Sequence, residues 1–314
     1  MKKVIQFELW QDCRFGCKFC SLGRIKTTNQ FKLENMHKAV NTIMGYEAGQ
    51  YDVVGFIGGE FFNGEMNDSL FTKFCELMTA ANDRLENKII KEVWLNVSLM
   101  NEFPKQLQFI LDYCLKEHDK VWLLTSYDTV GRFHTDKMFK NWENNLRIIH
   151  EKYPKIRTNI TTIITDDFID KYISGEFDLP TMMNKYQSTW FFKPTVKPDN
   201  YIDSPVSEVA KHIPNFFTTQ EKFINFLNVF RMREGDDVYQ KLFSNDLRAE
   251  EVIKNYNEEH SQVLFIRNDD EEKLIGETEE GDNTMMPCGH PRVYHSYLDT
   301  DGCVICDKNM VGGL

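Results

Sequence analysis

Short apolar stretches alternate with longer amphipathic ones through the first 194 residues. The short stretches have the length of strands, and apolar residues recur at helical spacing between them. The predicted strands are Val4–Trp10, Asp52–Ile57, Glu92–Ser98, Lys120–Ser126, Ile156–Ile164 and Gln187–Lys193. The predicted helices are Leu33–Tyr46, Asp68–Leu85, Pro104–Lys116, Asp136–Lys152 and Asp166–Ser174.

Strands that alternate with helices predict βα units around a parallel sheet. Six such units are too few for a closed eight-stranded barrel. The expected fold is therefore α/β, an open, partial (β/α)6 parallel barrel of the TIM type over residues 1–194. We expect its chemistry at the carboxyl ends of the strands.

The pattern changes after Lys193, where prolines punctuate the chain. Residues 195–284 are predicted to be a variable region, with helices at Gln220–Arg233 and around Glu250–Asn257. Within the same region, Val263–Arg267 and Lys273–Gly276 flank an acidic turn and predict a hairpin. Residues 285–314 form a small C-terminal extension that contains cysteines.

Composition narrows the class of protein. The chain has 314 residues, 41% of them hydrophobic, which is ample for a large core. Its formal net charge is -11 and it has no basic stripe, so a long nucleic acid is not an expected partner. It has no apolar run of membrane-spanning length, and its first residues enter a strand without a secretory leader. Six of its eight cysteines fall in two clusters, which indicates metal ligation in a reducing cytoplasm rather than disulfides.

The first cluster, Cys13, Cys17 and Cys20, has the spacing C-x3-C-x2-C in a loop that follows the first predicted strand. This spacing lets one loop place three thiolates around one soft metal site. A structural zinc site needs a fourth ligand, and the nearest histidine, His37, falls in a predicted helix. A zinc knuckle or a redox trio is the alternative interpretation.

The second predicted strand ends in Gly58, Gly59 and Glu60. Two glycines allow a ligand to approach the backbone closely, and a carboxylate beside them can bind an ammonium group. Taken alone, the three residues fit an ordinary turn with an exposed glutamate.

Together, the cysteine loop, the aromatic Phe19 before its last cysteine and the G-G-E sequence one βα unit later resemble the signature of the radical S-adenosylmethionine (radical SAM) enzymes. The resemblance implies that Cys13, Cys17 and Cys20 hold a 4Fe–4S cluster with one open iron. It implies that the G-G-E residues bind the amino group of SAM. It also implies reductive cleavage of SAM to a 5′-deoxyadenosyl radical, with an electron donor such as flavodoxin or ferredoxin.

Three further residues are assigned by the same resemblance. Ser126 and Asn159 fall in segments similar to the S-x-D and V-N-T-V-V-T sequences of radical SAM enzymes with SPASM or twitch extensions, and Asn96 stands where that group often has T-N-G. The resemblance implies that Ser126 and Asn159 face the ribose or the carboxylate of SAM, and we include Asn96 in the cofactor site. Polar residues at solvent-facing strand ends are the alternative.

The second cluster comprises Cys288, Cys303 and Cys306, with a predicted turn at Asp299–Gly302. It resembles the start of a SPASM or twitch domain, which implies a second iron–sulfur cluster. A zinc site that includes His290 is the alternative.

The substrate implied by the SPASM-like tail is a peptide or protein. A nucleotide or another small metabolite is the second candidate. A non-enzymatic metal-binding module is the rival from a different class of protein.

Overall fold

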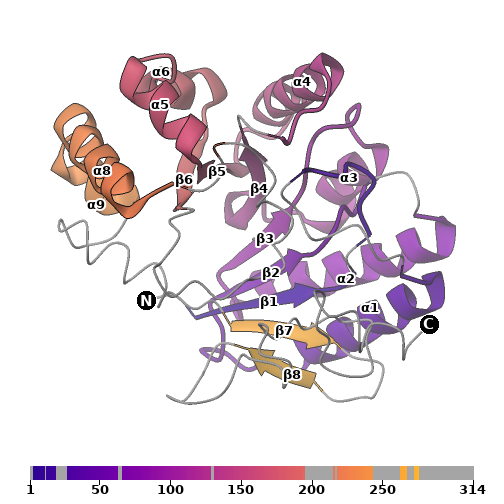
Figure 1. Ribbon diagram of the computed structural model, residues 1–314. Helices are drawn as coiled ribbons and strands as arrows, with labels where there is room; N and C mark the ends of the chain where they lie inside the picture. Colours follow the sequence, from indigo (N-terminus) through magenta and orange to yellow (C-terminus); the bar gives the residue numbers. More distant parts are fainter. Residues whose placement is uncertain are drawn as a thin grey trace, which may run out of the picture.

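A computed structural model of the chain describes residues 3–10, 12–18, 27–62, 66–128, 131–194, 215, 218–242, 262–266 and 272–275. In these residues, one sheet has the strand order β6-β5-β4-β3-β2-β1-β7-β8 (Figure 1). Its strands are β1 (Val4–Glu8), β2 (Val53–Ile57), β3 (Glu92–Asn96), β4 (Val121–Tyr127), β5 (Arg157–Ile164), β6 (Thr189–Pro194), β7 (Gln262–Ile266) and β8 (Glu272–Ile275). The α-helices are α1 (Asn29–Met44), α2 (Asp68–Glu86), α3 (Lys105–Phe109), α4 (Asp136–Lys152), α5 (Asp166–Ser174), α6 (Leu179–Tyr186), α8 (Gln220–Glu234) and α9 (Asp236–Leu242).

Strands β1 to β6 are parallel, and each pairs with the strand that follows it along the chain. A doubly wound sheet reverses its strand order part-way, whereas a TIM-type barrel keeps the sequential order seen here. The predicted α/β fold, with six successive parallel strands alternating with helices, is therefore confirmed. Its strand order is that of the predicted partial barrel.

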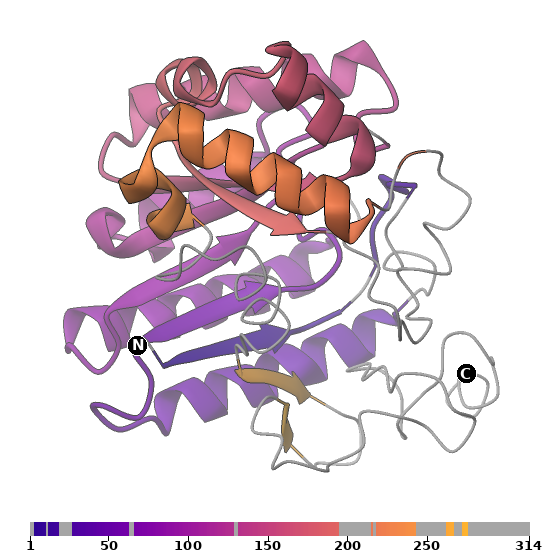
Figure 2. The ribbon, with the colours of Figure 1, turned by 60° about the vertical axis from the view of Figure 1, so that its left-hand side comes forward.

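Helices cover one face of this sheet. Right-handed crossovers place the helices that follow successive parallel strands on the same side, and these helices follow the outer side of the curved sheet in Figures 1 and 2. Trp142 of α4 donates its indole N–H to Thr125 of β4, so Thr125 faces the helices. Residues alternate along β4 and β5 between buried and partly exposed positions. The partly exposed residues therefore belong to the opposite face.

Side-chain caps set where the helices begin. Each capping residue accepts a hydrogen bond from the backbone N–H three residues further on, which would otherwise lack a partner in the helix. These caps are Thr28, Asn67, Thr135, Thr165, Asp178 and Thr219. Thr165 caps α5 directly after β5, so that this connection at the carboxyl edge of the sheet is short.

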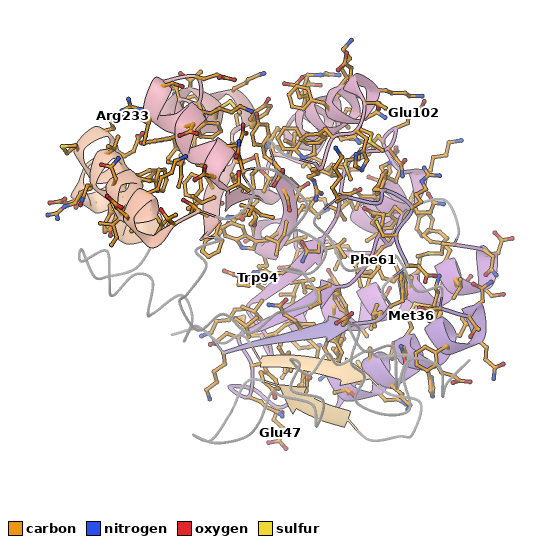
Figure 3. The ribbon with its side chains drawn as sticks, in the orientation of Figure 1. Met36, Glu47, Phe61, Trp94, Glu102 and Arg233 are labelled. Atoms are coloured by element: carbon orange, nitrogen blue, oxygen red, sulfur yellow. The ribbon has the colours of Figure 1, made fainter. Side chains whose placement is uncertain are left out.

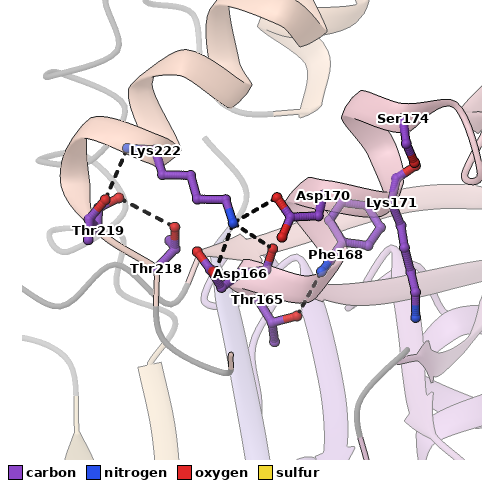
Figure 4. Close-up of polar contacts among 9 residues, drawn as sticks. All are labelled: Thr165, Asp166, Phe168, Asp170, Lys171, Ser174, Thr218, Thr219 and Lys222. Atoms are coloured by element: carbon purple, nitrogen blue, oxygen red, sulfur yellow. Dashed lines mark hydrogen bonds and ion pairs between the residues drawn. The ribbon is translucent and has the colours of Figure 1, made fainter. Parts of the chain in front are cut away.

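Lys222 attaches helix α8 to the start of α5 (Figure 4). Its Nζ lies 2.8 Å from Asp166 Oδ2 and 2.8 Å from Asp170 Oδ1. At the far end of α8, Arg233 donates to the carbonyl oxygens of Tyr172 and Ile173 (Figure 3). Helix α8 follows β6 and packs beside α5, so it takes the place of the sixth barrel helix.

Aromatic rings fill the space between α8 and the rest of the helical layer. Phe226 packs edge-on to Tyr172, with ring centroids 5.2 Å apart, and Phe230 stacks on the same tyrosine at 5.4 Å. Phe223, Phe226 and Phe230 are fully buried. These rings have the helical spacing of a core-facing stripe, and their burial stabilises the attachment of α8.

Strands β7 and β8 form the predicted hairpin, since they pair in antiparallel register. Strand β7 also pairs with β1 in parallel register, which adds a strand to the sheet on the side away from β6. The predicted helix around Glu250–Asn257 and the extension 285–314 lie outside the described residues. None of the described helices is long and apolar enough to cross a membrane.

The helical layer differs from the expectation in several details, one of which is helix α9, which was not predicted. The helix predicted over Pro104–Lys116 divides into α3 and a π-helical turn at Ile110–Cys114. Helix α6 was not expected, although Asp178 is its N-cap and a proline occupies its first turn, which are both start signals.

His150 makes the stability of the fold depend on pH. Burial lowers the pKa of its imidazole below the ordinary 6.5, against the opposing effect of a hydrogen bond to the Tyr186 carbonyl. The folded chain therefore binds this proton less readily than the unfolded chain does. The stability that comes from neutral His150 is present above pH 6.5 and is lost as the pH falls below 6.5, toward the folded-state value.

A His150→Gln variant, which cannot titrate at this position, should lose less stability than the wild type when the pH falls from about 7.5 to about 5.5. Denaturant unfolding at several pH values measures this difference. Parallel pH profiles for the two proteins would contradict the assignment.

Candidate functional site

The candidate site lies at the carboxyl ends of strands β1 to β4. The cysteine loop follows β1, and Gly58–Glu60 follow β2. Ser98–Asn101 follow β3, and Asp128 with Gly131–His134 follow β4. Because the strands are parallel, their carboxyl ends meet at one edge of the sheet, where α/β proteins place their functional residues.

Two backbone hydrogen bonds join the end of β2 to the start of the cysteine loop. Gly59 N–H donates to the Trp10 carbonyl oxygen at 2.9 Å, and Glu60 N–H donates to the Asp12 carbonyl oxygen at 2.8 Å. Gly58 has a φ of 131°, and a Cβ atom there would lie only 2.1 Å from the Trp10 oxygen. The two predicted motifs are thus in direct contact, and glycine at position 58 makes the contact sterically possible.

The rings beside this junction are tightly packed. Trp10 contacts Phe61 edge-on at 5.0 Å, and Phe61 lies against Phe74 of α2 at 5.2 Å (Figure 3). Trp10 and Phe61 are almost completely buried. This packing fixes the two chain segments that carry the motifs.

Glu60 is only 4% exposed. Its Oε1 accepts the N–H of Phe62 at 3.0 Å, and its Oε2 accepts the N–H of Ser98 at 2.8 Å. Two backbone amides from different loops therefore orient the group. Each carboxylate oxygen has a second acceptor position, so Glu60 retains the capacity to accept a hydrogen bond from a ligand.

Charged groups surround Cys17. Burial raises the pKa of its thiol, and the carboxylates of Asp128 and Glu60 raise it further, whereas the positive charge of Arg132 lowers it. The thiol is therefore protonated in the metal-free chain at neutral pH. A metal ion would have to displace this proton, as thiolate ligation generally requires.

Loops after β3 and β4 hold the outer side of the cysteine loop. Lys18 N–H donates to the Gly131 carbonyl at 3.0 Å, and the His134 ring nitrogen Nε2 lies 2.9 Å from the Gly16 carbonyl oxygen. Arg14 donates to the side-chain oxygen of Asn101. The loop is thus fixed from the directions of β2, β3 and β4.

Two cavities border this loop. One, of about 540 Å³, is lined by residues that include Arg14 and Phe15 of the loop and Asn101 after β3. The other, of about 380 Å³, is lined by residues that include Asp128 and His134. The first cavity thus lies against the loop itself, and the second lies against residues that hold the loop.

The other predicted cofactor residues lie on the face of the sheet opposite the helices. Asn96 and Asn159 both pair with Leu124, so the three residues form one row across β3, β4 and β5. Ser126 lies two residues nearer the carboxyl edge of β4. All three polar residues are partly exposed, and the Asn159 amide donates to Thr189 Oγ1 at 2.9 Å.

Five predicted site residues lie outside the described part of the chain. They are Phe19, Cys20, Cys288, Cys303 and Cys306. Within the described part, no group of three or more histidine, cysteine, aspartate or glutamate side chains is arranged to hold a metal ion. The three-cysteine sites at both ends of the chain stay predictions.

Sequence reasoning missed the polar residues that support the site. Asp12, Ser98, Arg132 and His134 belong to the loops around the cysteines, yet none of them is part of a motif. Only their positions in the sequence could have indicated them. Asp12 directly precedes Cys13, and both Arg132 and His134 come shortly after the end of a predicted strand.

A scan against protein-family models finds no match to the chain, and a search of the curated proteins finds none either.

Substitution of Gly58 by alanine should strongly destabilise the protein, because the new Cβ would collide with the Trp10 carbonyl. We expect a loss of roughly 3 kcal/mol or more in the free energy of unfolding. Denaturant unfolding measures this loss.

Gly175→Ala is the matched control, since Gly175 has a φ of 84° but nothing within 4 Å of a Cβ atom. It should cost about 1–2 kcal/mol, the penalty of the left-handed backbone alone. Equal losses in the two variants would show that the close approach to Trp10 is unimportant.

Proposed function

We propose that this protein is a radical SAM enzyme, which cleaves SAM reductively and abstracts hydrogen from a substrate. The observation that supports the proposal is the contact between two motifs that are distant in the sequence. The cysteine loop and Gly58–Glu60 share backbone hydrogen bonds, and the buried Glu60 carboxylate contributes to the field at Cys17. A metal held by the loop and a ligand bound by Glu60 would therefore be neighbours.

The residues present fit an iron–sulfur cluster. Thiolates are the ligands that such clusters use, and Cys13 and Cys17 lie on a loop fixed from three sides. Cys13, Cys17 and Cys20 would hold the cluster. When bound, the cluster would supply the electron that splits SAM into methionine and a 5′-deoxyadenosyl radical.

The chain's own residues would bind and orient SAM. Glu60 would accept a hydrogen bond from the ammonium group, and Gly59 would let the ligand approach the backbone, since the Trp10 carbonyl takes the space beside Gly58. Ser126 and Asn159 would contact the ribose or the carboxylate. The aromatic side chain of Phe19 would lie beside the cluster ligands.

The proposal also covers the substrate, the electron donor and the cellular location. A peptide or protein is the proposed substrate, with a nucleotide or small metabolite as the second candidate. Flavodoxin or ferredoxin would supply electrons in a reducing cytoplasm. Cys288, Cys303 and Cys306 would hold a second iron–sulfur cluster, for which zinc is the alternative.

Metal analysis after anaerobic reconstitution tests the cysteine assignments. Substitution of Cys13, Cys17 and Cys20 by alanine should remove about four irons per chain, because one cubane would be lost. Substitution of Cys288, Cys303 and Cys306 should remove about four more. Iron, zinc and sulfide content measure both effects.

Cys75→Ala is a control, since this partly buried cysteine lies on α2, away from the loop. It should leave the iron content unchanged. An unchanged iron content in the Cys13/Cys17/Cys20 variant would refute the first site, and loss of zinc in place of iron from the tail variant would make the tail a structural zinc site.

Glu60→Gln should weaken SAM binding by roughly ten- to a hundred-fold, because a charge-assisted hydrogen bond to the ammonium group would be lost. Glutamine preserves the shape and one carbonyl acceptor. Equilibrium binding of SAM to the iron-loaded protein measures the effect.

Glu47→Gln is the matched control, because Glu47 is exposed in the connection between α1 and β2, away from the carboxyl edge (Figure 3). It should leave the affinity for SAM unchanged. Equal affinities in wild type, Glu60→Gln and Glu47→Gln would exclude Glu60 from the SAM site.

A further inference from the structure

A buried ion pair lies at the base of the cysteine loop. Lys32 Nζ, from the second turn of α1, contacts Asp12 Oδ2, and each side chain is only 7% exposed. Asp12 is the residue directly before Cys13. The pair is thus one residue from the first of the three cysteines.

The second oxygen of the same carboxylate closes the loop. Asp12 Oδ1 accepts the backbone N–H of Thr27 at 2.6 Å. Asp12 and Thr27 flank residues 13–26, which include all three cysteines. The two ends of this segment are therefore joined through the Asp12 carboxylate. Thr28 caps α1, so Thr27 also fixes this end of the loop to the start of a helix.

The same pair is connected to the second motif. The Asp12 carbonyl oxygen accepts the N–H of Glu60, and Lys32 Nζ lies 5.5 Å from the centre of the Trp10 ring. The Trp10 carbonyl oxygen in turn accepts the N–H of Gly59. Asp12 and Lys32 thus contact both ends of the loop and the strand end that carries Glu60.

Stability alone does not account for such a pair. Loss of one partner leaves a buried charge and is costly, but neutral replacement of both partners is often harmless to stability. In some proteins a buried pair instead selects a single arrangement of the groups that it joins. Here those groups are the two ends of the cysteine loop and Glu60.

We propose that Asp12 and Lys32 are positioning residues that form a clasp: Asp12 closes the loop through Thr27, and Lys32 orients the Asp12 carboxylate. The clasp fixes the position of the cysteine loop relative to Glu60. Its significance for metal binding rests on the proposed function, but the closure of the loop does not.

Two double variants separate the clasp from simple stabilisation. Asp12→Asn/Lys32→Met removes both charges but keeps an oxygen that can accept the Thr27 N–H. Asp12→Ala/Lys32→Met removes both charges and the acceptor. Neither variant leaves a buried charge without a partner, so both should fold, and their thermal unfolding midpoints serve to check this.

The rate of hydrogen exchange of the Thr27 amide in the metal-free protein measures directly whether Asp12 closes the loop. We expect exchange at least about tenfold faster in Asp12→Ala/Lys32→Met than in wild type, because the loop opens locally. Asp12→Asn/Lys32→Met keeps the acceptor but loses the lysine that orients it, so it should exchange at a rate between those of the other two proteins. Equal exchange rates in all three proteins would overturn the clasp, whether or not the chain binds iron.

Iron binding at the N-terminal site then tests the positioning role. At limiting iron and sulfide, the alanine-containing variant should fill this site to a smaller extent than the asparagine-containing variant at matched stability. Equal filling despite different Thr27 exchange would overturn the positioning role. A wild-type protein that binds no iron would refute the proposed function, and the exchange result would still decide the closure.

Discussion

The close approach of the Trp10 carbonyl to Gly58 is the contact on which the rest of the site depends. It allows Gly59 and Glu60 to donate backbone hydrogen bonds to the residues that lead into the cysteine loop. The Cβ atom of any other residue at position 58 would collide with the Trp10 carbonyl oxygen. The contact therefore couples two motifs that are separated by a complete βα unit, and it sets the position of the buried Glu60 carboxylate relative to the loop.

The parallel sheet explains why these residues can meet at all. Its strands end at one edge, and the ends of β1 to β4 there lead into loops that precede the next helices. The loops after β2, β3 and β4 then reach the cysteine loop from different directions. Backbone groups make most of these contacts, so the geometry depends on the path of the chain more than on particular side chains. The polar residues Asn96, Ser126 and Asn159 lie on the face of the same sheet opposite the described helices.

Much of the fold could be predicted from the sequence because strands, amphipathic helices and the β7–β8 hairpin are local patterns. The pairing of β7 with β1 could not, since it joins segments more than 250 residues apart and neither carries a signal for the other. The candidate site shows the same division. Both motifs are visible as local sequence, whereas the pairing of Asp12 with Lys32 is not, because a lysine in a helix normally indicates a solvated face. Its burial follows from its contacts with Asp12 and with the ring of Trp10, which are properties of the tertiary structure.

The proposed reaction offers the most direct test of the central claim. The reconstituted protein should be incubated without oxygen with SAM and dithionite, and methionine and 5′-deoxyadenosine should be quantified. We predict equal amounts of the two products from the wild type and neither from a Cys17→Ala variant. An iron-loaded wild type that binds SAM but forms no 5′-deoxyadenosine, or a Cys17→Ala variant that forms it at the wild-type rate, would contradict the account.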